Sequence, residues 1–203
     1  NAASEYIAVW LGSKPSLPNG SAVDELAFLD RLLAVPVQYL PIPSRDGRRL
    51  AFAQRSLRQG IKTFVADVVP DSGMRALTAP PGDAVPVSWS FDNRYLIVAR
   101  SRDGDERDAL LRIDAETGET HEITGRPDDH FVFGGELHPN GRWLFYGATK
   151  DFATERPIES AWLWRHDLGT GERVCIAPPV DRTRMKPLVS RDGTELIYRR
   201  NDL

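Results

Sequence analysis

The densest group of residues able to hold a metal ion is an acidic cluster between two apolar runs. Its carboxylates are those of Asp103, Asp105, Glu106 and Asp108. Ca²⁺ prefers such oxygen ligands, but an EF-hand-type calcium loop spaces its acidic residues as D-x-D-x-D-G, an order that this cluster lacks. Arg102 and Arg107 also neutralise part of its charge. We therefore interpret the cluster as a solvated hairpin.

A second candidate for metal binding is the run Asp128, Asp129 and His130, which brings carboxylates and an imidazole together. No further His or Cys follows at the spacing of zinc ligands. The sequence also contains no glycine-rich loop of the kind that cradles phosphates. We expect neither a metal site nor a bound cofactor.

Serine-based hydrolysis needs a serine presented on a sharp turn, typically within G-x-S-x-G. No serine in this chain has glycine at both the −2 and +2 positions. A catalytic triad can be assembled from residues far apart in the sequence, so spacing alone does not exclude one. We nevertheless predict no catalytic residues here, because the histidines fall in or beside predicted strands and turns: His121, His130, His138 and His166.

The elements that must position these side chains are short strands, and they recur. A turn of the type Ser/His-x-Asp/Asn-Gly, or a close variant, precedes an apolar run at Ser44, Ser90, His138 and Ser190, about 46 to 52 positions apart. Between positions 86 and 125 lie four short apolar runs, 87–89, 95–100, 109–114 and 119–124, separated by turn residues. A four-stranded antiparallel unit with this period is typical of a β-propeller blade, so the fold class is predicted to be all-β.

The repeat predicts an N-terminal segment, 1–36, followed by a partial propeller, 37–203. Its blades are expected at 37–80, 85–125, 131–178 and 186–203, the last one truncated. The third blade contains a long middle loop, 148–160, of a kind that carries binding residues on propeller rims. Cys175, the single cysteine, lies in an apolar run of this blade and is interpreted as a packed strand residue.

The N-terminal segment is expected to hold one short helix. Ser21 is a candidate N-cap, Leu26, Leu29 and Leu33 fall on one helical face, and Pro36 marks the end. Residues 6–11 form a candidate strand. About three and a half blades make an incomplete ring and leave apolar blade faces uncovered, so we expect a fragment of a larger propeller that can self-associate through these faces.

The run from Asp30 to Pro36, followed by PSRDGRRLAF at 43–52, resembles the opening of prolyl oligopeptidase family (S9) serine peptidases. The similarity continues through the charged hairpin at 102–106 and through Phe133-Gly134-Gly135, and covers about 30–198. TolB-type and other WD40-like propellers share the repeat. The resemblance implies a propeller in front of an α/β-hydrolase domain of the same protein.

In that family the propeller caps the hydrolase domain and restricts entry to short peptides. The resemblance therefore implies a non-catalytic part of a serine peptidase, with the hydrolase domain and short peptides as partners. Because the first strand of each blade lines the central passage, Glu136 is the one candidate for a polar channel residue. The alternative is a TolB-like propeller that binds a protein partner and has no peptidase.

The amino-acid composition narrows the classes of function that remain. The net charge of −3 and the pI near 5.8 provide no basic surface of the kind that binds nucleic acid. No apolar run approaches the length of a membrane span, and no charged-then-apolar signal peptide opens the sequence, so we expect a cytoplasmic protein without membrane contact.

Overall fold

The computed structural model describes residues 22–57, 59–79, 82–102, 105–125, 128–177 and 186–198. The chain divides into two compact units, residues 1–35 and 36–203. In the first unit, helix α1 (Ala22–Leu33) confirms the predicted helix, with Arg31 in its last turn, where a cation favours the helix dipole. The proposed cap at Ser21 and the candidate strand at 6–11 lie outside the described residues.

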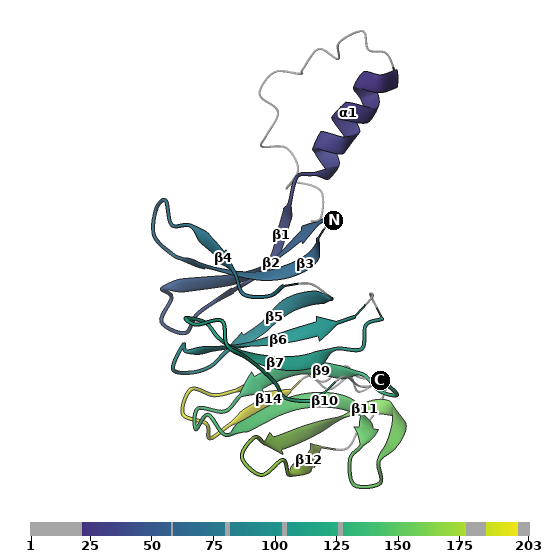
Figure 1. The fold of residues 1–203 in the computed structure, drawn as a ribbon. Helices are drawn as coiled ribbons and strands as arrows, with labels where there is room; N and C mark the ends of the chain where they lie inside the picture. The colour runs from purple at the N-terminus through teal and green to yellow at the C-terminus, as the bar shows by residue number, and fades with distance from the viewer. Residues whose placement is uncertain are drawn as a thin grey trace, which may run out of the picture. The chain divides into compact units, whose positions relative to one another are not determined.

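The second unit consists of antiparallel sheets whose strands pair in chain order (Figure 1). The first sheet contains β1 (Val37–Pro43), β2 (Arg49–Ser56), β3 (Gly60–Asp67) and β4 (Met74–Ala76). The second contains β5 (Asp83–Trp89), β6 (Tyr95–Ser101), β7 (Ala109–Asp114) and β8 (Thr120–Glu122). The third contains β9 (Val132–Leu137), β10 (Trp143–Asp151), β11 (Arg156–Asp167) and β12 (Arg173–Ala177). The fourth contains β13 (Pro187–Val189) and β14 (Leu196–Tyr198).

The sheets stack as propeller blades. The first strands of neighbouring sheets contact one another, β1 with β5, β5 with β9 and β9 with β13, as the inner strands of a propeller do. Within the described residues the sheets do not close into a ring (Figure 1). The predicted all-β fold of propeller blades, with an incomplete ring and one helix, is therefore confirmed.

The recurring turn is built by its own side chains. Ser44 Oγ lies 2.6 Å from Asp46 Oδ1, while the backbone N–H groups of Arg48 and Arg49 donate to the Asp46 carboxylate and the Ser44 hydroxyl. The same contacts recur at Ser90 and Asp92 and at Ser190 and Asp192. Short polar side chains that satisfy nearby N–H groups stabilise such turns, which explains why this pattern marks each blade.

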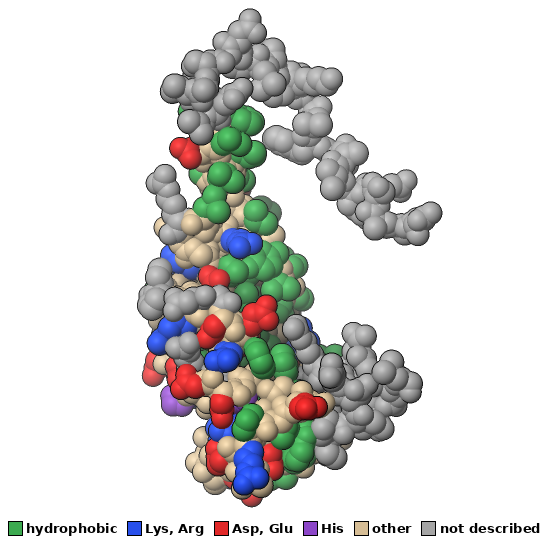
Figure 2. Space-filling model, turned by 90° about the vertical axis from the view of Figure 1, so that its right-hand side faces the viewer, with side chains coloured by type: hydrophobic (Ala, Val, Ile, Leu, Met, Phe, Trp, Pro, Cys, Tyr) green, Lys and Arg blue, Asp and Glu red, His purple; other side chains and the backbone are tan. Residues whose placement is uncertain are grey.

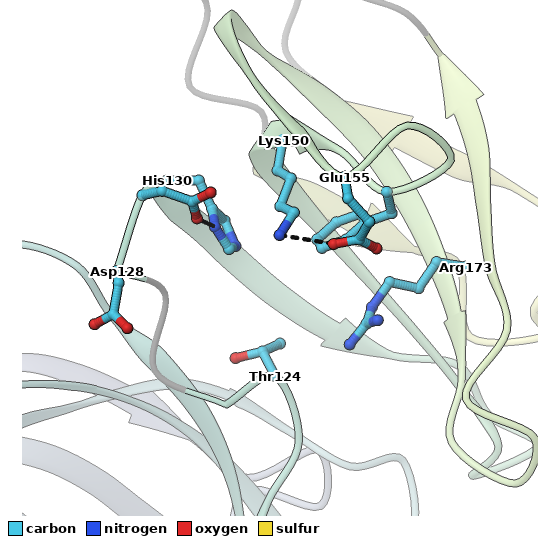
Figure 3. Close-up of a pocket in the computed structure, with 8 residues that line it drawn as sticks. Thr124, Asp128, His130, Lys150, Glu155 and Arg173 are labelled. Atoms are coloured by element: carbon cyan, nitrogen blue, oxygen red, sulfur yellow. Dashed lines mark hydrogen bonds and ion pairs between the residues drawn. The ribbon is translucent and has the colours of Figure 1, made fainter.

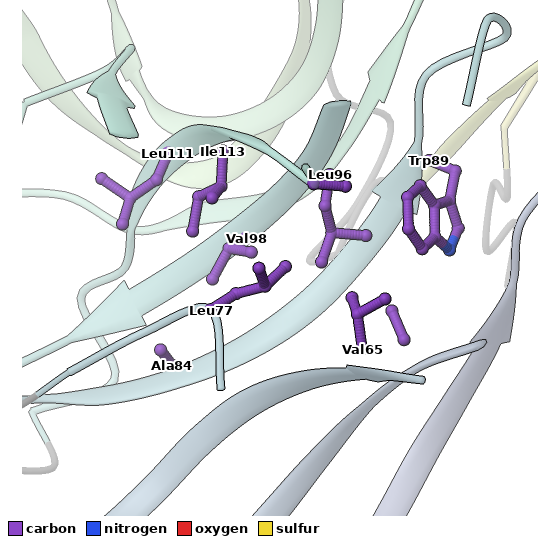
Figure 4. Packing of buried hydrophobic residues seen from close by; sticks show 10 residues of the cluster. Val65, Leu77, Ala84, Trp89, Leu96, Val98, Leu111 and Ile113 are labelled. Carbon is purple, nitrogen blue, oxygen red and sulfur yellow. The ribbon is translucent and has the colours of Figure 1, made fainter. Parts of the chain in front are cut away.

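Two apolar cores lie on opposite faces of β6. Leu96 and Val98 face the first core, which also contains Val65, Trp89 and Ile113 (Figure 4). Ile97 and Ala99 face the second core, against the third sheet. Because side chains alternate along a strand, a strand buried on both faces reads as a continuous apolar run. Each fully buried large side chain contributes about 1.5–3 kcal/mol, so the two cores hold the first three sheets together.

The expectation of a long loop at 148–160 is wrong. β10 continues to Asp151 and β11 begins at Arg156, which leaves only a short turn between them. The Asp151 carboxylate accepts the N–H of Ala153 at 2.9 Å and the hydroxyl of Thr154 at 2.7 Å, and Glu155 takes a positive φ of 57°. These contacts allow a tight turn to join β10 and β11. The β10–β11 hairpin therefore extends beyond the part of β10 that pairs with β9.

Apolar side chains remain exposed on the second unit. Figure 2 shows hydrophobic side chains grouped between charged ones on one face of the molecule. On the first sheet and its turns, the exposed large apolar residues are Val37, Leu40, Leu57, Val68, Val69 and Met74. Self-association through such faces stays a prediction, because nothing in the molecule shows a partner on them.

Candidate functional site

Glu136, the predicted channel residue, lies on β9. Its side chain is 4% exposed and forms an ion pair with the guanidinium of Arg45 in the turn between β1 and β2. That guanidinium also lies 4.4 Å from the centroid of the Phe91 ring, in the turn between β5 and β6. The ion pair of Glu136 with Arg45 thus connects the third sheet to the first, and the Arg45 guanidinium contacts the second sheet on the way.

Burial raises the pKa of the Glu136 carboxyl, while the charge and the hydrogen bond of the Arg45 guanidinium oppose this shift. The Ser88 hydroxyl donates to the carbonyl oxygen of Gly135 at 2.5 Å. A buried carboxylate is costly unless it is paired, so Arg45 is the main compensation for Glu136. The role of Glu136 in a substrate passage stays a prediction.

Of the four acidic residues in the cluster at 103–108, Asp103 lies outside the described residues. Asp108 is half-buried, and desolvation together with the charges of Asp105 and Glu106 raises the pKa of Asp108 to about 6. Asp108 is therefore less solvated than the sequence suggested. Among the residues that the structure describes, no three His, Cys, Asp or Glu side chains are grouped as metal ligands.

A cavity of about 470 Å³ opens between the second and third sheets (Figure 3). Its volume lies in the range of small-molecule sites. The lining side chains come from the end of the second sheet, the segment before β9, the β10–β11 hairpin and the start of β12: Thr124, Asp128, Asp129, His130, Lys150, Phe152, Glu155 and Arg173.

Phe152 forms the apolar centre of this cavity. Its ring meets those of Trp164, His130 and Tyr146 edge-on, at centroid distances of 4.9, 5.8 and 6.3 Å. The Arg173 guanidinium lies 4.6 Å from the Phe152 centroid, and Arg173 Nε donates to Tyr146 Oη at 3.0 Å. These contacts fix the ring and the cation relative to each other.

His130, considered above as a metal ligand, pairs with its neighbour instead. His130 Nδ1 lies 2.8 Å from Asp129 Oδ1, and this hydrogen bond lowers the pKa of the Asp129 carboxyl. His130 as a whole residue is 8% exposed. The structure therefore brings Asp128, Asp129 and His130 to the cavity, but with an aromatic ring and cations around them.

Sequence reasoning did not single out Lys150 or Arg173. The predicted loop at 148–160 includes Lys150 within a possible binding segment, but no sequence pattern marks Arg173. Arg173 reaches the cavity because its neighbour across the sheet is His166 on β11, whose strand carries Trp164 against Phe152. Only the pairing of three strands brings these groups together. The one available signal was the rise in aromatic residues within this blade.

A pH-dependent stability is expected from His166, which is 5% exposed and whose Nδ1 has no hydrogen-bond partner among the described residues. Burial and the charge of Arg173 lower its pKa to about 4. The unfolded chain therefore binds a proton below about 6.5 that the folded chain does not accept until about 4, so stability is lost as the pH falls through this window.

We expect this histidine to remove about 2 kcal/mol between pH 7 and pH 4.5. Urea unfolding at both pH values measures the loss, and His166→Gln should show a loss smaller by that amount. His121→Gln, an exposed histidine, is the control. An equal pH dependence in the wild type and His166→Gln would contradict the prediction.

Cys175, the single cysteine, lies half-buried in β12. It packs against the second core, where burial raises the pKa of its thiol. Helix α1, in the described part of the chain, is not long and apolar enough to cross a membrane.

No family model and no curated protein matches the sequence. Solved structures do match. TolB from Acinetobacter baumannii has a TM-score of 0.60 at 16% identity, covering 80% of this chain and 37% of that one. A prolyl endopeptidase has a TM-score of 0.62 at 14% identity, covering 82% and 26%. Puromycin hydrolase has a TM-score of 0.55 at 23% identity, covering 80% and 25%.

These similarities concern the fold, since the identities are low. They include both kinds of protein to which the sequence resemblance pointed, TolB and the prolyl endopeptidases. The chain spans between a quarter and about 37% of the length of these three solved chains.

Proposed function

We propose that this chain is the non-catalytic propeller portion of a serine peptidase of the prolyl oligopeptidase kind. In this proposal it caps an α/β-hydrolase domain of the same protein and admits short peptides while excluding folded proteins. Selection by exclusion requires a cap that does not open spontaneously. The blades must then be held together near the central passage, where their first strands meet.

The observation that carries the proposal is the partly buried ion pair of Arg45 with Glu136. It joins the first and third sheets beside the inner strands, and Trp89 Nε1 adds a bond of 2.9 Å to the carbonyl oxygen of Ile42 between β5 and β1. The absence of G-x-S-x-G from the sequence supports a role without catalysis in this chain. The fold shared with a prolyl endopeptidase supports the same reading.

The test uses the product of the whole gene. We expect it to hydrolyse a short unstructured peptide and to leave the same cleavage sequence intact within a folded protein, whereas the chain described here cleaves neither. Arg45→Met in the whole protein should retain peptide cleavage and lose part of the protection of the folded substrate. Equal cleavage of both substrates by the wild type, or turnover by the isolated chain, would refute the proposal.

The alternative is a propeller that binds a protein partner without any peptidase. The similarity to TolB supports it, at a TM-score comparable to that of the peptidase. The coding sequence after Leu203 discriminates the two. A following segment of hydrolase size with G-x-S-x-G, then Asp and His in that order, supports the peptidase, whereas a stop codon after further blades supports the binding module.

A further inference from the structure

Arg173 brings a positive charge to the cavity. Its Nε donates a hydrogen bond to Tyr146 Oη, and its guanidinium group lies over the Phe152 ring. Among the described residues, Arg173 forms no ion pair. Because a guanidinium binds oxyanions through its terminal nitrogens, the engaged Nε leaves the binding edge free. Stacking on a fixed ring orients that edge before any ligand arrives.

Lys150 supplies a second cation beside the same ring, with Nζ 5.9 Å from the Phe152 centroid. Its side chain is only 15% exposed, whereas its partner Glu155, at 2.8 Å, is 68% exposed. Ion pairs with one solvated member contribute little, so an incoming carboxylate can replace Glu155 while that side chain turns to solvent. The cavity therefore offers two cations to an anionic group.

The opposite side of the cavity is acidic. Figure 3 shows Asp128 and His130 on one side, Glu155 and Arg173 on the other, and the Lys150 ammonium group reaching into the space between. Asp128 is exposed, and its backbone oxygen accepts Arg107 Nη1 at 2.6 Å. Asp129 adds a second carboxylate, held by His130. A bare anion meets repulsion from this side, whereas a cationic group meets attraction.

From this separation of charge we propose that the cavity binds a small zwitterion, namely a free amino acid or a dipeptide. The ligand carboxylate pairs with Arg173 and Lys150, and its ammonium group lies toward Asp128 and Asp129. The volume of about 470 Å³ accommodates molecules of this size. The site lies between the outer parts of two blades and does not depend on the proposed peptidase function.

The test is a titration of this chain with four small molecules, followed by amide and indole NMR shifts and by calorimetry. They are dialanine, its C-terminal amide, N-acetyl-dialanine and acetate. We expect saturable binding of dialanine, about tenfold weaker binding of the amide and a smaller loss for the N-acetyl form, because each change removes one charged contact. Acetate should bind too weakly to saturate.

Arg173→Met should abolish dialanine binding. Arg165→Met is the matched control, because Arg165 stacks 4.9 Å from the Trp143 centroid on the same sheet but does not line the cavity. If Arg173→Met fails to fold, the ligand comparison on the wild type decides alone. Absence of saturable binding by dialanine, equal binding of its amide, acetate binding as tightly as dialanine, or full binding by Arg173→Met would each overturn the proposal.

Discussion

Arg45→Met is expected to lower the free energy of unfolding by about 3 kcal/mol. The substitution leaves the Glu136 carboxylate buried without the cation that compensates it, and removing one partner of a buried ion pair typically costs about 3–5 kcal/mol. We expect the lower end because the Arg45 side chain is 39% exposed, so water screens part of the attraction. Urea unfolding at pH 8 measures the change.

The accompanying variants separate a lost charge from a lost side chain. Arg48→Met, an exposed arginine of the same turn, should change stability by less than about 0.5 kcal/mol. Adding Glu136→Gln to Arg45→Met should restore much of the loss, because the unpaired carboxylate is then absent. If the free-energy changes of the two substitutions were strictly additive, the ion pair of Arg45 with Glu136 would not be what stabilises the protein. An Arg45→Met protein as stable as the wild type would lead to the same conclusion.

The cost of Arg45→Met should also depend on pH. Burial already raises the pKa of Glu136, and loss of Arg45 raises it further. A carboxyl whose pKa is raised in the folded state destabilises the fold fully at pH values above that pKa. As the pH falls through it, the folded state takes up a proton before the unfolded state does, and the destabilisation shrinks. The difference between Arg45→Met and the wild type should therefore shrink as the pH falls toward 5.

Gly135→Ala is expected to cost about 3 kcal/mol. Gly135 has a φ of 150°, and an added Cβ would lie 3.0 Å from Ile97 Cγ2 and 3.2 Å from Leu110 Cδ1. Both neighbours are fully buried on the second sheet, so neither can withdraw to solvent. Overpacking of this kind costs about 1–3 kcal/mol, and the positive φ adds strain.

Gly141→Ala provides the matched control. It also has a positive φ, 69°, but no atom lies within 4 Å of the added Cβ. Its cost should be the backbone strain alone, about 1 kcal/mol. Thermal and urea unfolding distinguish the two variants. Equal losses would mean that close contact between β9 and the second sheet is unimportant for stability.

The repeated blade was predictable because the information is local. The turns at Ser44, Ser90 and Ser190 use side chains that bond to residues two to five positions away. The copy at Ser90 has Asn93 in place of glycine, and it works because asparagine tolerates its φ of 60°. Local chemistry of this kind can be read from the sequence without knowing how the sheets pack.

The candidate site was less predictable, because its contacts are not local. Glu136 was proposed from its place on an inner strand, but its partner Arg45 lies 91 positions away. Arg173 reaches the cavity only through the pairing of β10, β11 and β12. The loop predicted at 148–160 is instead mostly strand, although the Asp151 contacts that close its turn are local.

The outermost strands of the first two sheets are short: Met74–Ala76 and Thr120–Glu122 each span three residues, and all six residues are exposed. An unpaired strand edge can template cross-β polymerisation when it is long, flat and apolar. Three residues that include Arg75 or Glu122 provide too few backbone donors and acceptors for a foreign strand to add. The rim of these two blades is therefore protected against amyloid-like growth, even where the chain carries exposed apolar side chains.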